Sequence, residues 1–126
     1  MKVVSIKDIE GTERDVHCPH KGFRSLRIVL ERDGVGFSMH KTIIPCGDTQ
    51  HWHYTRHMEV CYCIAGHGEL RNLKTAEPYF IEADTAYILD SHDDHTFTAF
   101  DEVVLISVFN PALRGTETHR EDGSYD

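Results

Sequence analysis

The sequence has 126 residues, 40% of them hydrophobic and 27% charged, a composition typical of one soluble globular domain. The 21 acidic and 13 basic residues give a net charge of −8 at pH 7, which argues against a nucleic-acid or anionic-membrane partner. No apolar run is long enough to span a membrane, and the charged start MKVVSIKDIEGTERD lacks the apolar segment of a signal peptide, so a cytoplasmic protein is expected.

The hydrophobic pattern predicts short strands almost throughout. One helical turn is expected within residues 5–13, followed by a strand over 24–30 with two alternating sets of side chains. Further strands are expected over residues 36–44, 58–66, 68–73, 86–90, 95–100 and 102–110. Strands 58–66 and 68–73 are expected to form a hairpin around Gly66-His67-Gly68. The pattern predicts an all-β single domain, a small β-barrel or jelly-roll-like sandwich with little helix.

The four cysteines do not suggest a disulfide framework in a cytoplasmic chain of this size. They are Cys18, Cys46, Cys61 and Cys63. The Cys61-x-Cys63 pair lacks the two-residue spacer of common zinc and redox motifs. Buried thiols are therefore favoured over metal ligands at these two positions.

The stretch HWHYTRHME, residues 51–59, places three histidines and a glutamate within nine residues. Small β-barrel cupins carry a first motif of Gly, five residues, His-x-His, three residues, Glu, six residues and Gly. The corresponding residues of this chain are Gly47, His53, Thr55, Glu59 and Gly66. A second cupin motif keeps its spacing but only its final histidine, and its positions hold Asp84, Asp90, His92 and His95. The spacing therefore predicts a cupin whose metal site has been rebuilt.

Strand alternation places Glu59 on the same face as Cys61 and Cys63. If this face points into the barrel, the carboxylate needs a cation or hydrogen bonds, because an isolated buried charge is costly. His95 comes from a different strand and can meet Glu59 across the lumen. One imidazole and one carboxylate suit Fe(II), Mn(II) or Zn(II), and a third ligand is expected.

The chain resembles the ectoine synthases, a family of small cytoplasmic cupins, over nearly its whole length. The segments that show the resemblance are DIEGTERDVH (8–17), FRSLRIVLERDGVGFSMHKTII (23–44), HYTRHMEVCYCIAGHGE (53–69), YILDSHDDH (87–95) and VFNPALRGTETHREDGSY (108–125). Their order along the chain is more specific than either cupin motif alone. The resemblance implies a single cupin domain over residues 1–126 and a homodimer.

The resemblance also implies a metal site and a reaction. The metal ligands are Glu59, Tyr87 and His95, with Fe(II) the expected ion and Mn or Zn as alternatives. The reaction is the ring closure of N-γ-acetyl-L-2,4-diaminobutyrate with loss of water, which gives ectoine, a compatible solute of the osmotic stress response. A Lewis acid there polarises the amide oxygen. His53 occupies the first cupin ligand position, yet the resemblance assigns it no metal role.

The remaining expected site residues contact the substrate. The resemblance implies Phe23, Arg27, His40, Thr42, Tyr54, His57, Phe109, Glu117 and His119, and Ser107 is added beside Phe109. Arg27 is expected to clamp the substrate carboxylate, because a guanidinium binds it bidentately, although an exposed strand arginine is the alternative. Glu117, His119 and Tyr54 are the acid–base candidates. Residues 115–126, polar in composition, are expected to form a C-terminal tail that closes over the barrel mouth.

The chain departs from the family pattern at four positions. Phe23 stands where tryptophan is usual, Ser107 where cysteine is common, Asp84 at a turn glycine, and Ala112 at a proline. Phe23 and Ser107 touch the expected pocket, so they bear on rate and substrate choice. Two alternatives follow: a related cupin enzyme acting on another small amide or amino acid, and a non-catalytic cupin that binds a small solute.

Overall fold

The computed structural model describes residues 1–18, 22–47 and 49–117. Its elements are α1 (Ile6–Ile9), β1 (Asp15–His17), β2 (Arg24–Val29), the 3₁₀ turn η1 (Glu31–Asp33), β3 (Ser38–Ile44), β4 (Gln50–Trp52), β5 (Met58–Ala65), β6 (Gly68–Asn72), β7 (Pro78–Ile81), β8 (Ala86–Leu89), β9 (His95–Ala99) and β10 (Val103–Asn110). The predicted helical turn and the seven predicted strands are all present. The short strands β1, β4 and β7 were not predicted. No helix in the described part of the chain is long and apolar enough to cross a membrane.

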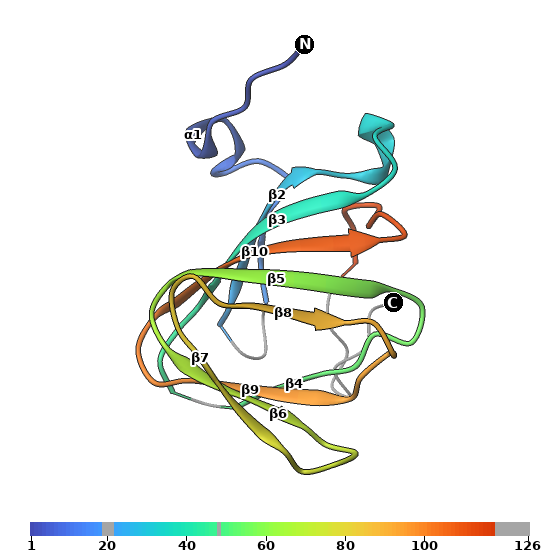
Figure 1. Ribbon diagram of the computed structural model, residues 1–126. Coiled ribbons are helices and arrows are strands. Elements are labelled where there is room, and N and C mark those ends of the chain that lie inside the picture. Colours follow the sequence, from blue (N-terminus) through green and yellow to red (C-terminus); the bar gives the residue numbers. More distant parts are fainter. Residues whose placement is uncertain (19–21, 48, 118–126) are drawn as a thin grey trace.

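Two antiparallel sheets face one another (Figure 1). The six-stranded sheet has the order β1-β2-β3-β10-β5-β8, and the four-stranded sheet has the order β4-β9-β6-β7. The expected all-β barrel-like sandwich is confirmed. Because β-strand side chains alternate between faces, every second residue of β3, β5 and β10 is buried between the sheets.

The expected hairpin between residues 58–66 and 68–73 is wrong. Strand β5 pairs with β10 and β8, whereas β6 pairs with β7 and β9 in the other sheet. The turn at Gly66 therefore carries the chain from one sheet to the other. A Cβ atom on Gly66 would lie 2.1 Å from the carbonyl oxygen of Glu102, so only glycine fits this close crossing.

The alternation predicted for β5 is confirmed. Glu59, Cys61 and Cys63 are buried, and the intervening side chains of the strand are exposed. On β2 residues 25–27 are all buried, so alternation there does not distinguish side chains that point into the barrel from those that point outward.

Asp84, expected to replace a turn glycine, has a φ of +66°, and its N–H donates to the carbonyl oxygen of Cys63.

Candidate active site

A small cavity of about 10 Å³ lies between the two sheets. It is lined by Phe23, Ser25, His40, Thr42, Trp52, Tyr54, Glu59, Tyr87, Leu105, Ser107 and Phe109. Most of the predicted site residues thus meet in one place, contributed by strands far apart in the sequence. A wider hollow of about 400 Å³ between β7 and β8 is lined by Tyr87 and His95 among others.

Glu59 projects from β5 into this cavity and is 6% exposed. Burial raises the pKa of its carboxyl group to about 7, against the opposing effect of hydrogen bonds from Cys61 and Ser107. A carboxylate held in such surroundings is stabilised by a nearby cation. Glu59 is therefore suited to bind a metal ion.

Tyr87 and His95 present polar atoms that lack partners. The Tyr87 Oη and the His95 Nε2 are buried and accept or donate no hydrogen bond among the described residues. The His95 Nδ1 lies 2.9 Å from the carbonyl oxygen of Asp93, so Nδ1 bears the proton and Nε2 exposes its lone pair. Burial lowers the pKa of His95, which keeps the imidazole neutral as a metal ligand must be.

The Tyr87 phenol stays protonated without a cation. Burial raises its pKa well above 10, and the neighbouring Cys61 and Glu59 raise it further. In the described part of the chain, no three His, Cys, Asp or Glu side chains form a cluster that can hold a metal. Tyr87 lines both the cavity that contains Glu59 and the wider hollow that contains His95, and phenol, carboxyl and imidazole groups together suit a divalent transition metal.

His40 is linked to Arg27 through a serine. The Arg27 Nε donates to Ser25 Oγ at 3.4 Å, and Ser25 Oγ lies 3.2 Å from His40 Nδ1. The serine hydroxyl can accept from the arginine and donate its own proton to Nδ1, an arrangement in which His40 carries its N–H at Nε2. His40 Nε2 is buried and has no partner among the described residues. Burial, followed by the charge of Arg27, lowers the pKa of His40 to about 3.

A second polar row crosses the six-stranded sheet. Thr42 Oγ1 lies 3.3 Å from Ser107 Oγ, which lies 3.5 Å from Cys61 Sγ. This row of two hydroxyls and a thiol lies beside the Glu59 carboxyl group, and Ser107 provides the site with a small neutral hydrogen-bonding group.

Aromatic rings surround these polar groups. Phe23 and Trp52 meet edge to face with ring centroids 5.4 Å apart, and Tyr54 meets Phe109 in the same way at 5.2 Å. The Tyr54 ring centroid also lies 6.1 Å from that of His95. These rings exclude water from the polar groups, which strengthens electrostatic interactions inside the cavity.

Four predicted site residues in the described part of the chain do not line the cavity, and one of them, His95, lines the wider hollow instead. Arg27 is buried, and its terminal nitrogens donate to the carbonyls of Gly115 and Glu117. His57 is half-buried and, with Glu117, lines a separate hollow of about 500 Å³ at the barrel mouth. The alternative that Arg27 is an exposed strand arginine is wrong. His119, and the tail beyond Glu117, lie outside the described residues.

The Glu117 carboxylate is engaged by its own turn. It accepts hydrogen bonds from the N–H groups of Arg114 and Gly115 at 2.7 and 2.8 Å. Burial alone would raise the pKa of Glu117, but these bonds and the charge of Arg27 hold it below the ordinary value. Glu117 is therefore ionised at neutral pH.

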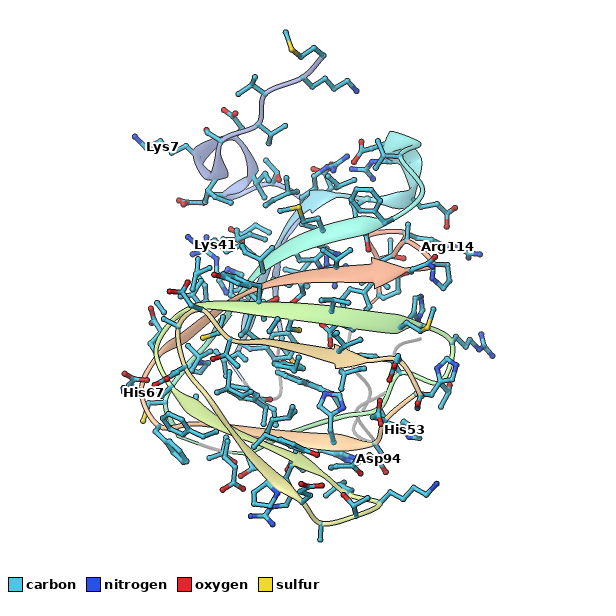
Figure 2. All side chains as sticks on the ribbon, viewed as in Figure 1. Lys7, Lys41, His53, His67, Asp94 and Arg114 are labelled. Atoms are coloured by element: carbon cyan, nitrogen blue, oxygen red, sulfur yellow. The ribbon has the colours of Figure 1, made fainter. Side chains whose placement is uncertain are left out.

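Ser25 and Trp52 line the cavity but were not predicted as site residues. The sequence could not predict the role of Ser25, because that role depends on a hydrogen bond to His40, fifteen positions away. Trp52 lies between His51 and His53 and is buried in strand β4. A large apolar residue between two histidines was the sequence signal for its position in the cavity. His53 itself is half-buried in the loop after β4 and is labelled there in Figure 2.

Known proteins resemble this chain over almost its full length. The sequence profile of ectoine synthases matches residues 1–126. An L-ectoine synthase of Alkalilimnicola ehrlichii is 44% identical over 126 residues, covering 99% of this chain and 94% of that protein. An L-ectoine synthase of Halalkalibacterium halodurans is 42% identical over 125 residues, covering 99% and 95%.

Solved structures agree with these relatives. The crystal structure of an ectoine synthase from P. lautus has a TM-score of 0.85 and 36% identity, covering 91% of this chain and 81% of that one. An RmlC-like cupin from Shewanella frigidimarina has a TM-score of 0.66 at 19% identity, covering 81% and 87%, which supports the cupin fold alone. The chain belongs to the ectoine synthase family.

Proposed function

We propose that this protein converts N-γ-acetyl-L-2,4-diaminobutyrate to ectoine by cyclisation and loss of water, as a carbon–oxygen lyase. The observation that supports this most directly is the inner cavity. There the buried Glu59 carboxyl group lies beside His40 Nε2 and Tyr87 Oη, which have no hydrogen-bond partner in the described part of the chain. The family of the chain supplies the identity of the reaction. The net charge of −8 agrees with a small-molecule substrate rather than nucleic acid.

Glu59, Tyr87 and His95 would hold the cofactor, with Fe(II) proposed and Mn(II) or Zn(II) as alternatives. A divalent metal bound there supplies Lewis acidity toward the amide oxygen of the substrate. The fit rests on the unpartnered Tyr87 Oη and His95 Nε2 and on the buried Glu59 carboxyl group. Glu59 and Tyr87 belong to the paired strands β5 and β8, whereas His95 comes from the opposite sheet.

The reaction forms one C–N bond and breaks one C–O bond. The α-amine attacks the acetamide carbon, and the amine proton must leave as the new bond forms. The carbinolamine oxygen then departs as water once it has gained a proton, which leaves the cyclic amidine. His40 is suited to donate its Nε2–H to a substrate oxygen, because Ser25 orients the ring and burial keeps it neutral.

The cavity walls also position the substrate. Phe23, Tyr54 and Phe109 bring ring surfaces against its carbon chain, and Thr42 and Ser107 offer hydroxyl groups. We propose Tyr54, Glu117 and His119 as the acid–base groups, and His57 and Arg27 as substrate contacts at the mouth.

A cavity of about 10 Å³ is too small for the substrate, so the cavity walls or the segment at the mouth move when substrate enters.

The test is turnover by the metal-free protein with and without Fe(II) under anaerobic conditions, with ectoine followed by NMR. We expect ectoine only with iron, and a loss of at least about 1000-fold in rate in Glu59→Ala. Glu69→Ala is the matched control, because Glu69 lies on β6 and pairs with Arg71 outside the cavity. A folded, iron-loaded protein that makes no ectoine would contradict the proposal.

Phe23 and Ser107 favour a second candidate, an enzyme of this family that acts on another small amide or amino acid. Both residues line the cavity, where one ring or hydroxyl changes which substrate fits. Product identity separates the two candidates. A non-catalytic solute-binding cupin is the third, and metal-dependent turnover would exclude it.

We also propose that the protein acts as a cytoplasmic homodimer. The outer face of β5 and β8 is apolar and exposed, with Met58, Val60, Tyr62, Ile64 and Ile88. A contiguous apolar face of this kind is characteristic of an interface. Sedimentation of the wild type and of Val60→Lys tests this: dimers are expected only in the wild type, and a wild-type monomer would contradict the proposal.

A further inference from the structure

One buried arginine contacts the chain after β10 at two carbonyl groups. Arg27 on β2 is 2% exposed. Its Nη1 donates to the carbonyl oxygen of Gly115 at 2.8 Å, and its Nη2 donates to that of Glu117 at 2.6 Å. Hydrogen bonds from a charged donor are stronger than neutral ones, so each of these two contacts contributes strongly beside the Arg114–Glu31 ion pair. Figure 2 labels Arg114, where the attached turn begins beyond the end of β10.

The attached turn, residues 114–117, is closed by its own carboxylate. Glu117 accepts from the N–H groups of Arg114 and Gly115, so the amides of the turn are bound internally and its carbonyls are left for Arg27. Gly115 has a φ of +115°, and a Cβ atom there would lie 2.8 Å from Leu30 Cδ1. The turn therefore fits closely against the barrel at this point.

Leu113, the residue before the turn, is fully buried. Its N–H donates to Ser38 Oγ at 2.9 Å, and its carbonyl accepts from the N–H of Glu31 at 2.8 Å. The described part of the tail is thus built into the fold. Among these contacts, only those of Arg27 reach both the turn and the lining of the cavity, since its Nε donates to Ser25.

We propose that Arg27 is a positioning residue that docks the 114–117 turn and thereby fixes Glu117 at the barrel mouth. The docking itself is independent of the reaction, whereas its effect on turnover rests on the proposed function. A guanidinium has five N–H donors, so the three bonds described leave two available to a substrate carboxylate. Binding of the 114–117 turn and binding of the substrate carboxylate are two separate roles for Arg27, and they predict different results for the same variant.

The first experiment measures amide hydrogen exchange by NMR in the full chain, free of metal and substrate. In Arg27→Gln we expect the Arg114 and Gly115 amides to exchange about 10- to 100-fold faster, because two charge-assisted bonds are lost. Amides of β3 and β10 should keep their protection if the barrel is folded. Arg24→Gln is the matched control on the same strand, where the side chain pairs with Asp15, and it should leave both turn amides unchanged.

Arg27→Lys is the second variant, because the neutral substitution removes a buried charge and risks unfolding. Lysine keeps the charge but lacks the fork that binds two carbonyls at once, so intermediate exchange rates are expected. Wild-type exchange at Arg114 and Gly115 in a folded Gln or Lys variant would overturn the proposal.

Steady-state kinetics provides the second readout. Docking predicts a fall of about tenfold or more in kcat when Arg27 is replaced by Lys, with a smaller change in KM, since Glu117 is then displaced from the mouth. A raised KM with unchanged kcat and unchanged exchange would identify Arg27 as a substrate clamp only and reject the docking role. If the wild type makes no ectoine, the proposed function fails, yet the exchange measurement still decides the docking.

Discussion

The two sheets contribute differently to the interior of the barrel. The six-stranded sheet buries the polar side chains Ser25, Arg27, Ser38, His40, Thr42, Glu59 and Ser107. The four-stranded sheet buries mainly the apolar side chains Trp52, Leu70, Ile81, Phe97 and Ala99, together with Gln50 and His95. The chemistry is thus concentrated on one sheet, and the other sheet covers it with hydrophobic surface. His95 and Gln50 are the polar exceptions, and the proposed metal site, which includes His95, would depend on how the two sheets face each other.

The largest effect should come from the apolar sheet. Phe97 is fully buried and stacks on Tyr87 with ring centroids 6.3 Å apart. Phe97→Ala is expected to lower the free energy of unfolding by about 3–5 kcal/mol, because it removes the ring and leaves a cavity. Urea unfolding measures this, with the exposed Phe100→Ala as control. Equal, small losses in the two variants would show that the four-stranded sheet does not form the core.

The next effect concerns the proposed metal ligands, which come from both sheets. Tyr87→Phe keeps the ring against Phe97 but removes the donor oxygen, so Fe(II) affinity should fall at least about 100-fold with little change in stability. Metal titration measures the affinity, and a visible phenolate-to-iron band after oxidation to Fe(III) should vanish. Tyr79→Phe on exposed β7 is the control. An unchanged band would exclude Tyr87 as a ligand.

The pH dependence of stability tests the polar sheet. The folded pKa of His40 is lowered to about 3, from an unfolded value near 6.5, so only the unfolded chain takes up a proton between these values. Stability should therefore fall as pH drops below about 6.5, by about 2 kcal/mol for this group at pH 5. Glu59, whose pKa is raised, acts with the opposite sign between about pH 4.5 and 7.

His40→Asn isolates the histidine contribution, because the variant retains Glu59. Between pH 7 and 5 the loss from His40 and the gain from Glu59 nearly cancel in the wild type, so the free energy of unfolding of the variant, measured by denaturant, should rise relative to that of the wild type by about 2 kcal/mol. Parallel curves for the two proteins would mean that His40 is accessible to protons in the folded state.

The smallest effect should come from Ser25. Ser25→Ala removes the group that orients His40 and is expected to cost about 1 kcal/mol of stability. The ¹⁵N chemical shifts of labelled His40 should change from one tautomer, protonated at Nε2, to a mixture. A single unchanged tautomer would show that the serine does not set the proton position.

The fold was largely predictable because the long central strands alternate strongly. Strands β3, β5 and β10 bury every second side chain, and this periodicity is visible in the sequence. The three-residue strands β1 and β4 are too short to show a period. The β5–β6 hairpin was predicted wrongly because Gly-His-Gly permits both a tight hairpin and a crossing between sheets, and only the contact with Glu102 distinguishes them.

The site was predictable where one strand face fixes the direction of a side chain. Glu59 follows from the alternation of β5, and His40 and Thr42 share a face of β3. Arg27 was not resolved by alternation, because β2 is covered on both sides and the partner of the arginine is a turn about ninety positions later. The metal, catalytic and substrate roles stay predictions until the experiments above are done.

The small size of the cavity has a consequence for the equilibrium between bound substrate and bound product in the proposed reaction. Its volume of about 10 Å³ accommodates about one water molecule. When substrate expands this space, the aromatic lining admits little solvent with it, so the bound amidine meets few molecules able to hydrolyse it. A low water content in the cavity thus favours the bound amidine over the bound amide, even though the solvent outside the protein is almost entirely water.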